Sequence, residues 1–575
     1  MKKKFLAVFG IIGALALASC DNTGNNSNNT SNSNYSSAQA NNTSVEIAED
    51  TITEQFSLTD ESGNIISGNN GVYIITSAGT YTAKGKLESG QIYVDASNED
   101  VEIDLKGVSI ASQALSPIYV NDCANFTLKA VNESLNYIYD NRTTDYSGTT
   151  DDTNGTGAVF VKNGDLKVKG KGTLSIQSAA NSGIHGKDNV SVKNVTMLIQ
   201  AVNNGIKGND KVTIEENPTL GIVAGNNGIV TSNSDMGTNA QHGYIYINGG
   251  TITINSYGDG IDAAYSVYVG TSTDSDGVTY SPSIDIYTNK YSSYINTSES
   301  SSSTSSTTTT TTTYAQFGPG GNPGMMPGGG FNGGGMAGGQ AAEKADSSAK
   351  AIKANESIDI TAGNIFTYTY DDSLHTNCDE KLENGNTPKA AINISGGTLN
   401  LKASDDAIHA DGTLTVNGGT INVIESHEGL EGKAIVINDG NITVTANDDG
   451  VNASNSIIIT GGRLDVNMSN NGDVDGIDSN GTISITGGII ITRGPNSEMA
   501  APLDADRTIT MTGGILIVVG YCPTLSTKLT KTASTSGNTT GTHTVTVGSD
   551  TISYTNNYSY NGQTTVYASS SATIK

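Results

Sequence analysis

The sequence predicts an all-β protein whose chain is wound into coils of about 21–26 residues. A short phrase recurs along the chain: a polar or acidic pair, a small residue, an aliphatic residue, a polar residue and a small residue, as in 203–208 and 448–453. Successive aliphatics are 22, 23 and 32 residues apart in a first array and 22, 21, 26 and 26 apart in a second. They are Ile184, Ile206, Ile229 and Ile261, then Ile408, Leu430, Val451, Ile477 and Leu503. A period in the low twenties, made of strands and Gly/Asn/Asp turns, is typical of a β-solenoid.

The elements follow this period. Strands are expected over 45–59 and 71–97, first coils at 91–94 and 117–120, and a further one at 158–161. One coil can be followed completely as three short strands over 183–186, 189–192 and 195–199, which predicts a triangular cross-section.

Alternation within strands separates the inward from the outward side chains. In 418–423 the aliphatics Ile421 and Val423 are expected to point inward, and Thr420 and Asn422 outward. The glycine pairs that precede such strands are expected to occupy turns with positive φ, which is costly for other residues.

The domain organisation begins with an export signal. Residues 1–20 join three lysines to a short apolar run, and the ending Leu17-Ala18-Ser19-Cys20 resembles the lipobox of bacterial lipoproteins, in which the cysteine is lipidated. An ordinary signal peptide is the alternative interpretation. Residues 21–44 form an Asn/Ser-rich tether, 45–520 the coiled domain, and 521–575 a C-terminal cap. The chain is therefore expected to be exported and anchored by lipid at Cys20 to the bacterial cell envelope or surface, with no other membrane contact.

Within the coiled domain, residues 296–345 are predicted to be a disordered Ser/Thr- and Gly/Met-rich insertion. This insertion is also where a protein partner could bind.

Composition excludes several functions. The formal charge of −27 makes the surface repel nucleic acid, and a polyanionic ligand would need bridging cations. Besides Cys20, three widely spaced cysteines give neither a disulfide framework nor a zinc spacing.

The polar positions that flank the repeated aliphatic become acidic in the later coils. Stacked coils would bring these like charges to within about 5 Å, where they repel unless a cation neutralises them. Calcium takes six to eight oxygens, so the acidic edge is predicted to bind Ca²⁺. The alternative is that Asp serves only the chemistry of tight turns. The predicted ligands are Asp259, Asp262, Asp405, Asp406, Glu428, Glu431, Asp448, Asp449, Asp473, Asp475, Asp478 and Asp504.

Three histidines, His185, His375 and His409, follow the repeated aliphatic directly and are interpreted as outward polar filler. His427 stands beside Glu428 and could join the acidic site.

The phrases at 183–188, 203–208, 405–410 and 428–432, with the Gly-Gly-Thr-Ile strands, resemble those of the secreted carbohydrate-binding-domain β-helix proteins of clostridia. The resemblance implies a right-handed parallel β-helix similar to pectate lyases, which binds calcium and has affinity for cellulose or acidic, pectin-like polysaccharide. The early coils have Asn203 and Asn204 where the family often has Asp, so calcium is not expected there.

Three functions remain. The favoured one is a non-catalytic, lipid-anchored protein that binds polysaccharide through Ca²⁺. The second is a calcium-dependent pectate lyase, which would need a basic residue beside the metal. The candidates for that base are Lys433, Arg463, Arg493 and Arg507. The third is a structural adhesin or spacer.

Overall fold

The computed structural model describes residues 49–143, 152–233, 235, 242–288, 348–378, 381–382 and 385–575. The predicted signal peptide, the tether and the 296–345 insertion lie outside these residues. All regular elements of the described residues are β-strands, so the all-β prediction is confirmed. No helix among them is long and apolar enough to cross a membrane.

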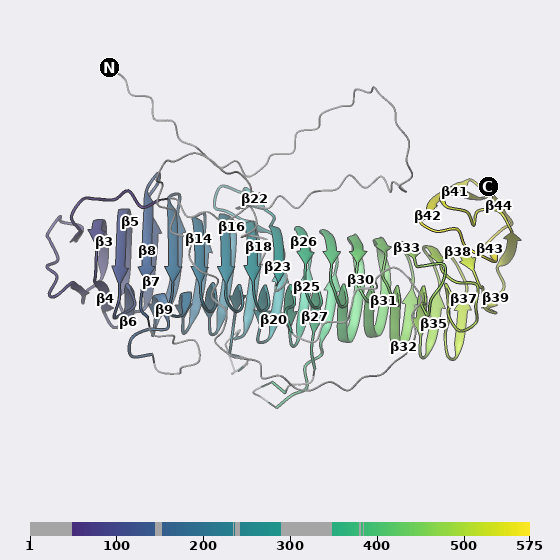
Figure 1. Ribbon diagram of the computed structural model, residues 1–575, viewed down its shortest axis with the longest axis horizontal. Coiled ribbons are helices and arrows are strands. Elements are labelled where there is room, and N and C mark those ends of the chain that lie inside the picture. Colours follow the sequence, from purple (N-terminus) through teal and green to yellow (C-terminus); the bar gives the residue numbers. More distant parts are fainter. Residues whose placement is uncertain are drawn as a thin grey trace, which may run out of the picture. The chain divides into compact units, whose positions relative to one another are not determined.

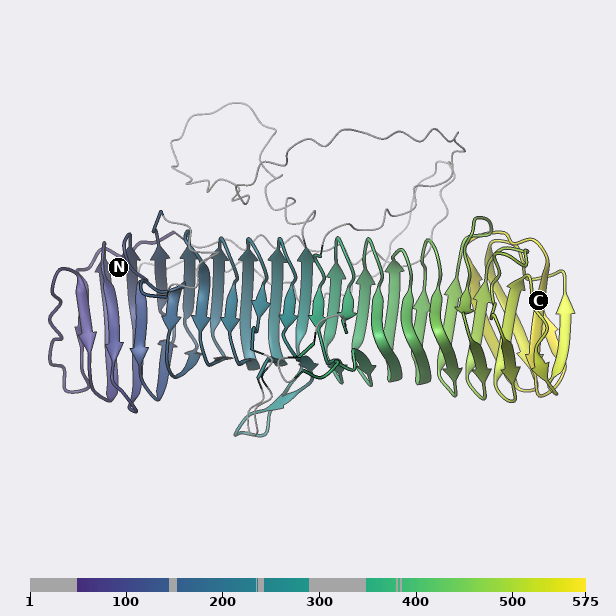
Figure 2. The same ribbon diagram turned by 90° about the horizontal axis from the view of Figure 1, so that it is seen from below.

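The strands lie side by side along the long axis of the unit Ile47–Lys575 (Figure 1). Parallel pairing sorts them into three stacks, and the chain passes through the stacks in turn (Figure 2).

The first stack contains β2 (Val72–Ile75), β4 (Gln91–Asp95), β6 (Ile118–Asp122), β9 (Gly157–Val161), β12 (Ser182–Gly186), β15 (Ile206–Gly208), β17 (Ile229–Val230), β19 (Ile261–Ala263), β24 (Ile352–Ala354), β27 (Leu374–Thr376) and β34 (Ile477–Ser479). The second contains β7 (Asn125–Ala130), β10 (Asp165–Gly170), β13 (Asn189–Lys193), β20 (Ser266–Val269), β25 (Ser357–Ile360), β28 (Ala391–Ile394), β35 (Thr482–Ile485), β37 (Thr508–Met511) and β39 (Ser526–Thr527). The third contains β8 (Leu135–Asp140), β11 (Thr173–Ser178), β14 (Thr196–Ala201), β23 (Ser283–Thr288), β26 (Asn364–Tyr368), β29 (Thr398–Lys402), β33 (Arg463–Asn467), β36 (Ile489–Arg493) and β38 (Ile515–Gly520).

Longer strands bend from one stack into the next. They are β3 (Gly79–Leu87), β5 (Asp100–Ser112), β16 (Lys211–Ala224), β18 (Tyr244–Ser256), β30 (Ile408–Glu425), β31 (Leu430–Val444) and β32 (Val451–Ile459). Because these strands continue through the corners, 39 strands belong to one continuous sheet that encloses the core.

This arrangement corrects the predicted fold class. A regular right-handed parallel β-helix with 21–26 residues per coil is wrong for this chain, because one continuous closed sheet replaces the uniform repeat. The spacing of paired residues in parallel strands runs from 16, between Thr510 and Ser526, to 91, between Ile261 and Ile352. Antiparallel pairs also join β1 (Ser57–Thr59) to β3 and β43 (Gln563–Ala568) to β38. Lengthening a surface loop costs little free energy, so the strand register persists although the connections vary.

The core is a set of stacked aliphatic rows. The repeated aliphatics predicted to point inward, from Ile184 to Leu503, are fully buried, as is Ile421, whereas Thr420 and Asn422 are partly exposed. The predicted alternation is therefore confirmed. Each row places branched side chains directly above one another, which gives the core its dispersion contacts and its hydrophobic stabilisation.

The C-terminal strands form two groups. β43 pairs with β38, and β40 (Thr530–Ser534) pairs with β43, so these two extend the main sheet at its end. β41 (Gly541–Val547), β42 (Asp550–Asn556) and β44 (Ala572–Ile574) form a separate antiparallel sheet. Val545 and Ile552 join Ile491 and Ile517 in a second apolar cluster. The segment predicted to be a cap thus buries outward side chains of β36 and β38. Elsewhere, β21 (Ser272–Thr273) and β22 (Thr279–Tyr280) form a hairpin.

Each glycine pair before a third-stack strand has two separate functions. The second glycine has positive φ, for example 84° at Gly488, as the sequence predicts. The first lies against the coil before it, because a Cβ on Gly487 would be 2.1 Å from the carbonyl oxygen of Thr460. No side chain fits there without moving the backbone.

Replacing Gly487 with alanine should therefore destabilise the protein by about 2 kcal/mol. The matched control is Gly432→Ala, whose Cβ would meet no atom closer than 3.4 Å and which should change stability by less than about 0.5 kcal/mol. Thermal unfolding of both variants measures the difference. Equal midpoints for the two would contradict the close approach of the coils.

Candidate functional site

Two rows of polar side chains flank the buried aliphatics of the first stack, and we call them the edge rows. The preceding row, two residues before each aliphatic, contains Asn204, Asn227, Asp259, Lys350, Asp372, Asp406, Glu428, Asp449 and Asp475. The following row, one residue after it, contains His185, Lys207, Val230, Asp262, Lys353, His375, His409, Glu431, Asn452 and Asp478. Because the register is parallel, each member lies beside the equivalent residue of the next coil.

The preceding row ties successive coils together. Oδ1 of Asn204 accepts a hydrogen bond from the backbone N–H of Asn227 at 3.2 Å. Oδ1 of Asp449 accepts one from the N–H of Asp475 at 2.9 Å. The same bond is made by the side chains of Asn227, Asp259, Asp372, Asp406 and Asp475. Asn and Asp do this equally well, so the local chemistry of the turn requires a side-chain oxygen but not a negative charge.

Basic residues neutralise the middle of the edge rows. Nζ of Lys350 lies 2.5 Å from Oδ2 of Asp371 and 3.2 Å from Oδ2 of Asp372, and Nδ1 of His375 lies 2.5 Å from Oδ2 of Asp372. Burial opposes charge on Lys350, but the two carboxylates outweigh it and raise its pKa. Nζ of Lys353 lies 4.0 Å from Oδ2 of the predicted ligand Asp259. The carboxylates of Asp371, Asp372 and Asp259 are therefore paired with lysine side chains of the protein.

His409 is a cation among three carboxylates. Its Nδ1 lies 3.3 Å from Oδ2 of Asp406 and 3.2 Å from Oε2 of Glu431, and its Nε2 lies 3.4 Å from Oδ1 of Asp411. Burial lowers the pKa of His409, but these partners raise it to about 11 overall, and the ion pair lowers the pKa of Asp411 to about 2. The interpretation of His409 as filler is therefore wrong, because His409 is a counter-ion within the edge. His375 is not filler either, because its Nδ1 is bound to the carboxylate of Asp372.

The last part of the edge rows lacks such partners. We call Glu428, Asp448, Asp449, Asp475, Asp478 and Asp504 the acidic segment. Among the described residues, no lysine or arginine nitrogen lies within 4.0 Å of these carboxylates; the nearest basic group is His427, with Nε2 3.9 Å from Oδ2 of Asp448.

The pKa values of this segment show the result. Burial raises the pKa of Glu428 to about 8, with further contributions from Glu431, Asp406 and Asp449. Burial, together with Asp475, Asp448 and Asp478, raises the pKa of Asp449 to about 7. The pKa of Asp478 rises to about 6 from burial and the charges of Asp475 and Asp504. Like charges are thus held together without a compensating cation, as the stacking argument predicts.

The donor set of this region fits a divalent cation. Ligand atoms of His427, Glu428 and Asp448 lie within 4.8 Å of one another, as do those of Asp405, Asp406 and His427. Nδ1 of His427 is buried and has no hydrogen-bond partner among the described residues. An oxygen-rich group of this kind suits Ca²⁺, which accepts irregular geometry and several carboxylates.

The structure separates the other predicted ligands from this region. Asp262 accepts a hydrogen bond from Nδ2 of Asn227 at 2.9 Å, in the neutralised part of the edge. Asp473 is exposed and lies outside the edge rows.

The candidate lyase bases are not gathered at the acidic segment. Arg463 and Arg493 belong to the third stack and both bond to Asp465, at 2.7 and 2.5 Å, and Arg493 is only 2% exposed. Lys433 and Arg507 are exposed and form no ion pair with any described residue.

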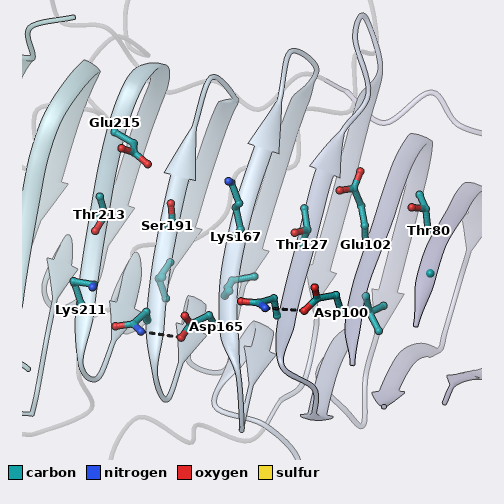
Figure 3. A pocket seen from close by; sticks show the side chains of 16 residues that line it. Thr80, Asp100, Glu102, Thr127, Asp165, Lys167, Ser191, Lys211, Thr213 and Glu215 are labelled. Atoms are coloured by element: carbon teal, nitrogen blue, oxygen red, sulfur yellow. Dashed lines mark hydrogen bonds between the residues drawn. The ribbon is translucent and has the colours of Figure 1, made fainter. Parts of the chain in front are cut away.

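A second polar surface lies on the second stack (Figure 3). Outward side chains of β5, β7, β10, β13 and β16 line a shallow groove of about 680 Å³. Nδ2 of Asn125 donates to Oδ1 of Asp100 at 2.7 Å, and Nδ2 of Asn189 donates to Oδ1 of Asp165 at 2.8 Å. Each of these strands contributes at least two polar side chains to the groove, as Asp165 and Lys167 do on β10. The sequence repeat of this face is too weak to have predicted it.

Comparison with known proteins gives a consistent family description. A family model described as "Carbohydrate-binding domain-containing protein" matches residues 69–391, 336–429 and 425–575. A protein of Acetivibrio thermocellus with the same description is 27% identical over 126 residues, which are 21% of this chain and 43% of the relative. The match thus spans less than half of that relative's length. The solved structure of the polysaccharide lyase-like protein from C. thermocellum, a gadolinium derivative, is 26% identical and covers 39% of this chain and 84% of its own, with a TM-score of 0.34.

In a chelating buffer, we expect the unfolding midpoint to fall by about 5 °C as pH rises from 5 to 8. Glu428, Asp449 and Asp478 have pKa values of about 8, 7 and 6 in the folded state, above those of an unfolded chain. Their contribution is complete below the unfolded values near 4 and is lost as pH rises through the folded values.

The triple variant Glu428→Gln, Asp449→Asn, Asp478→Asn should flatten this profile, whereas Asp259→Asn, at an equivalent but neutralised position, should not. The measurement is thermal unfolding monitored by circular dichroism. A triple variant with the pH dependence of the native protein would show that these carboxylates do not repel one another as described.

Proposed function

We propose, because this chain belongs to the family of carbohydrate-binding domain-containing proteins, that it binds an acidic polysaccharide through Ca²⁺ held at the acidic segment. One observation carries the proposal: half-buried carboxylates are stacked along the edge rows with no lysine or arginine partner among the described residues. A bound divalent cation would remove this repulsion.

Glu428 and Asp448, whose ligand atoms lie within 4.8 Å of one another and of His427, would hold one ion. Asp449, Asp475 and Asp478, on the next coils of the same rows, would hold a further ion, with Asp504 at the margin. Oδ1 of Asp449 and of Asp475 already accepts a backbone N–H from the next coil, so Oδ2 is the oxygen left for a ligand. When bound, Ca²⁺ would supply open coordination positions that carboxylates of the polysaccharide can fill. The net charge of −27 otherwise repels such a polymer, so the cation also sets the specificity for acidic chains.

The chain would act at the bacterial cell surface. Support comes from the sequence alone: the lipobox-like ending at Cys20 and the Asn/Ser-rich tether, which together would hold the binding domain away from the membrane.

Affinity electrophoresis through polygalacturonate tests the proposal. We expect strong retardation in calcium and much weaker retardation in chelator. The double variant Asp449→Asn, Asp478→Asn should weaken the calcium-dependent retardation by about tenfold or more, because two ligand charges are lost. Asp449→Asn keeps the hydrogen bond between coils, since Asn204 and Asn227 make the same bond.

The matched control is Asp259→Asn, the same substitution in the same row where Lys353 provides the charge. It should behave as the native protein. Retardation that ignores chelator, or that falls equally in the control, would exclude calcium bridging at the acidic segment. Ultraviolet absorbance of the same mixtures detects unsaturated products and would reveal a lyase.

Calcium binding at pH 7 should also release protons, about one per ion, because Glu428 and Asp449 titrate near 8 and 7. Calorimetry in two buffers of different ionisation enthalpy measures the number released. Heats that do not depend on the buffer would place the ion elsewhere.

A further inference from the structure

The edge rows end in a basic pocket at the side away from the acidic segment. Asn181, Ser182, His185, Lys187, Asn204 and Lys207 line it, and its volume is about 250 Å³. His185 and Lys207 are neighbours in the following row, on β12 and β15. The following row therefore carries a lysine here, Lys207, and the two rows carry carboxylates without a lysine or arginine partner among the described residues further along.

Lys207 is the unusual member of this pocket. Its ammonium group forms no ion pair and no hydrogen bond with any described residue, although the lysines Lys350 and Lys353 of the same edge both have carboxylates within 4.0 Å. The side chain is only partly exposed. Burial and the neighbouring charge of Lys187 both lower the pKa of Lys207. A partly buried ammonium group beside another cation is a binding site for an anion.

The remaining pocket groups do not supply that anion. Asp152 is the acidic residue of the lining, and its carboxylate is held by Nζ of Lys187 at 2.8 Å and Nζ of Lys162 at 3.4 Å. Asp152 thus compensates Lys187, and Lys207 is the cation of the lining that has no carboxylate partner among the described residues.

His185 lines the pocket as an uncharged side chain. Burial lowers its pKa to about 3, with help from Lys207 and Lys187. Nδ1 lies 2.6 Å from Oγ1 of Thr156, and Nε2 lies 3.1 Å from Oδ1 of Asn209, so both ring nitrogens are occupied. The interpretation of His185 as outward filler is therefore wrong as well.

Asn204 adds a fixed donor. Its Oδ1 accepts the N–H of Asn227, which leaves Nδ2 available to donate. The pocket thus offers an ammonium group and an amide N–H, the donors that a carboxylate and an adjacent sugar hydroxyl accept.

We propose that this pocket binds the carboxylate of a uronic acid residue directly, without a metal ion. The proposal rests on the proposed function for its ligand class, an acidic polysaccharide, but not on calcium. Six register steps in the following row separate Lys207 from Glu431, which at the spacing of parallel strands is roughly 30 Å. One long acidic chain lying along the edge rows would reach both sites.

Calorimetry with trigalacturonate in excess chelator tests this site apart from the calcium site. We expect saturable binding that weakens with salt. Lys207→Gln, which replaces the ammonium group with a neutral polar amide, should weaken it by about tenfold or more. The matched control is Lys167→Gln, a lysine of the second-stack groove that also lacks a carboxylate partner among the described residues and should have no effect.

Two further measurements distinguish a site for a uronate from a general anion site. The fully methyl-esterified trimer should not bind the native protein, and this arm needs no variant that might misfold. Inorganic phosphate should compete poorly; phosphate that displaces the trimer at equal concentration would mean a general anion site and overturn the assignment to a uronate. The double variant Asp449→Asn, Asp478→Asn should bind the trimer normally in chelator.

If the trimer does not bind in chelator, the pocket is not a uronate site. Calcium-dependent retardation could still be observed, because it tests the other site. Equal loss in Lys207→Gln and Lys167→Gln would likewise contradict the assignment to the pocket. Loss of calcium-dependent retardation alone would contradict the proposed calcium site and leave the pocket standing.

Discussion

The parallel register between successive coils is the constraint on which the rest of the structure depends. It places each side chain beside its equivalent in the next coil, at the roughly 4.8 Å spacing of paired strands. For Ile184 and the aliphatics above it, this repetition produces a continuous buried row. For a charged position the same repetition is costly, because every coil adds a like charge next to the last. The register therefore decides both what holds the core together and where charge accumulates.

The edge rows differ along their length in how they treat the repulsion between like charges on successive coils. Asn204 and Asn227 supply the side-chain oxygen that the next coil requires and bring no charge. In the middle, Lys350 and His409 compensate the carboxylates. At Asp449 and Asp475 neither solution is used. Two unit charges about 5 Å apart at an effective dielectric constant of 20 repel by about 3 kcal/mol, whereas a hydrogen bond contributes about 1 kcal/mol. Since asparagine makes the same bond, coil stacking does not explain the carboxylates, whereas the proposed cation would.

The sequence alone predicted the features that repeat within a few residues of the chain. It did not predict the features that depend on pairing between coils. The inward aliphatics and the positive φ of Gly488 follow from alternation and turn chemistry within a few residues, and both were predictable. The uniform coil was wrong, because strands such as β30 continue from one stack into the next and join one continuous closed sheet, which no local pattern shows. Likewise, Lys350 and His409 appear as isolated basic residues in the sequence. Their function as counter-ions follows only from the coils that bring Asp371 and Glu431 to them.

Charge changes sign along one continuous surface. Near one end of the edge, Lys207 is an ammonium group without a carboxylate partner among the described residues. Towards the other end, Glu428 and Asp449 are carboxylates without a partner among the described lysines and arginines. The internally compensated part lies between them and has little net field to attract an ion. If both proposals hold, a bare polyanion would be drawn to the first end and repelled by the second until a divalent cation reverses the charge there. The two ends would then attract the same polymer by different means, and only the second would depend on calcium. Such an edge would hold an acidic chain weakly when calcium is scarce and firmly when it is abundant.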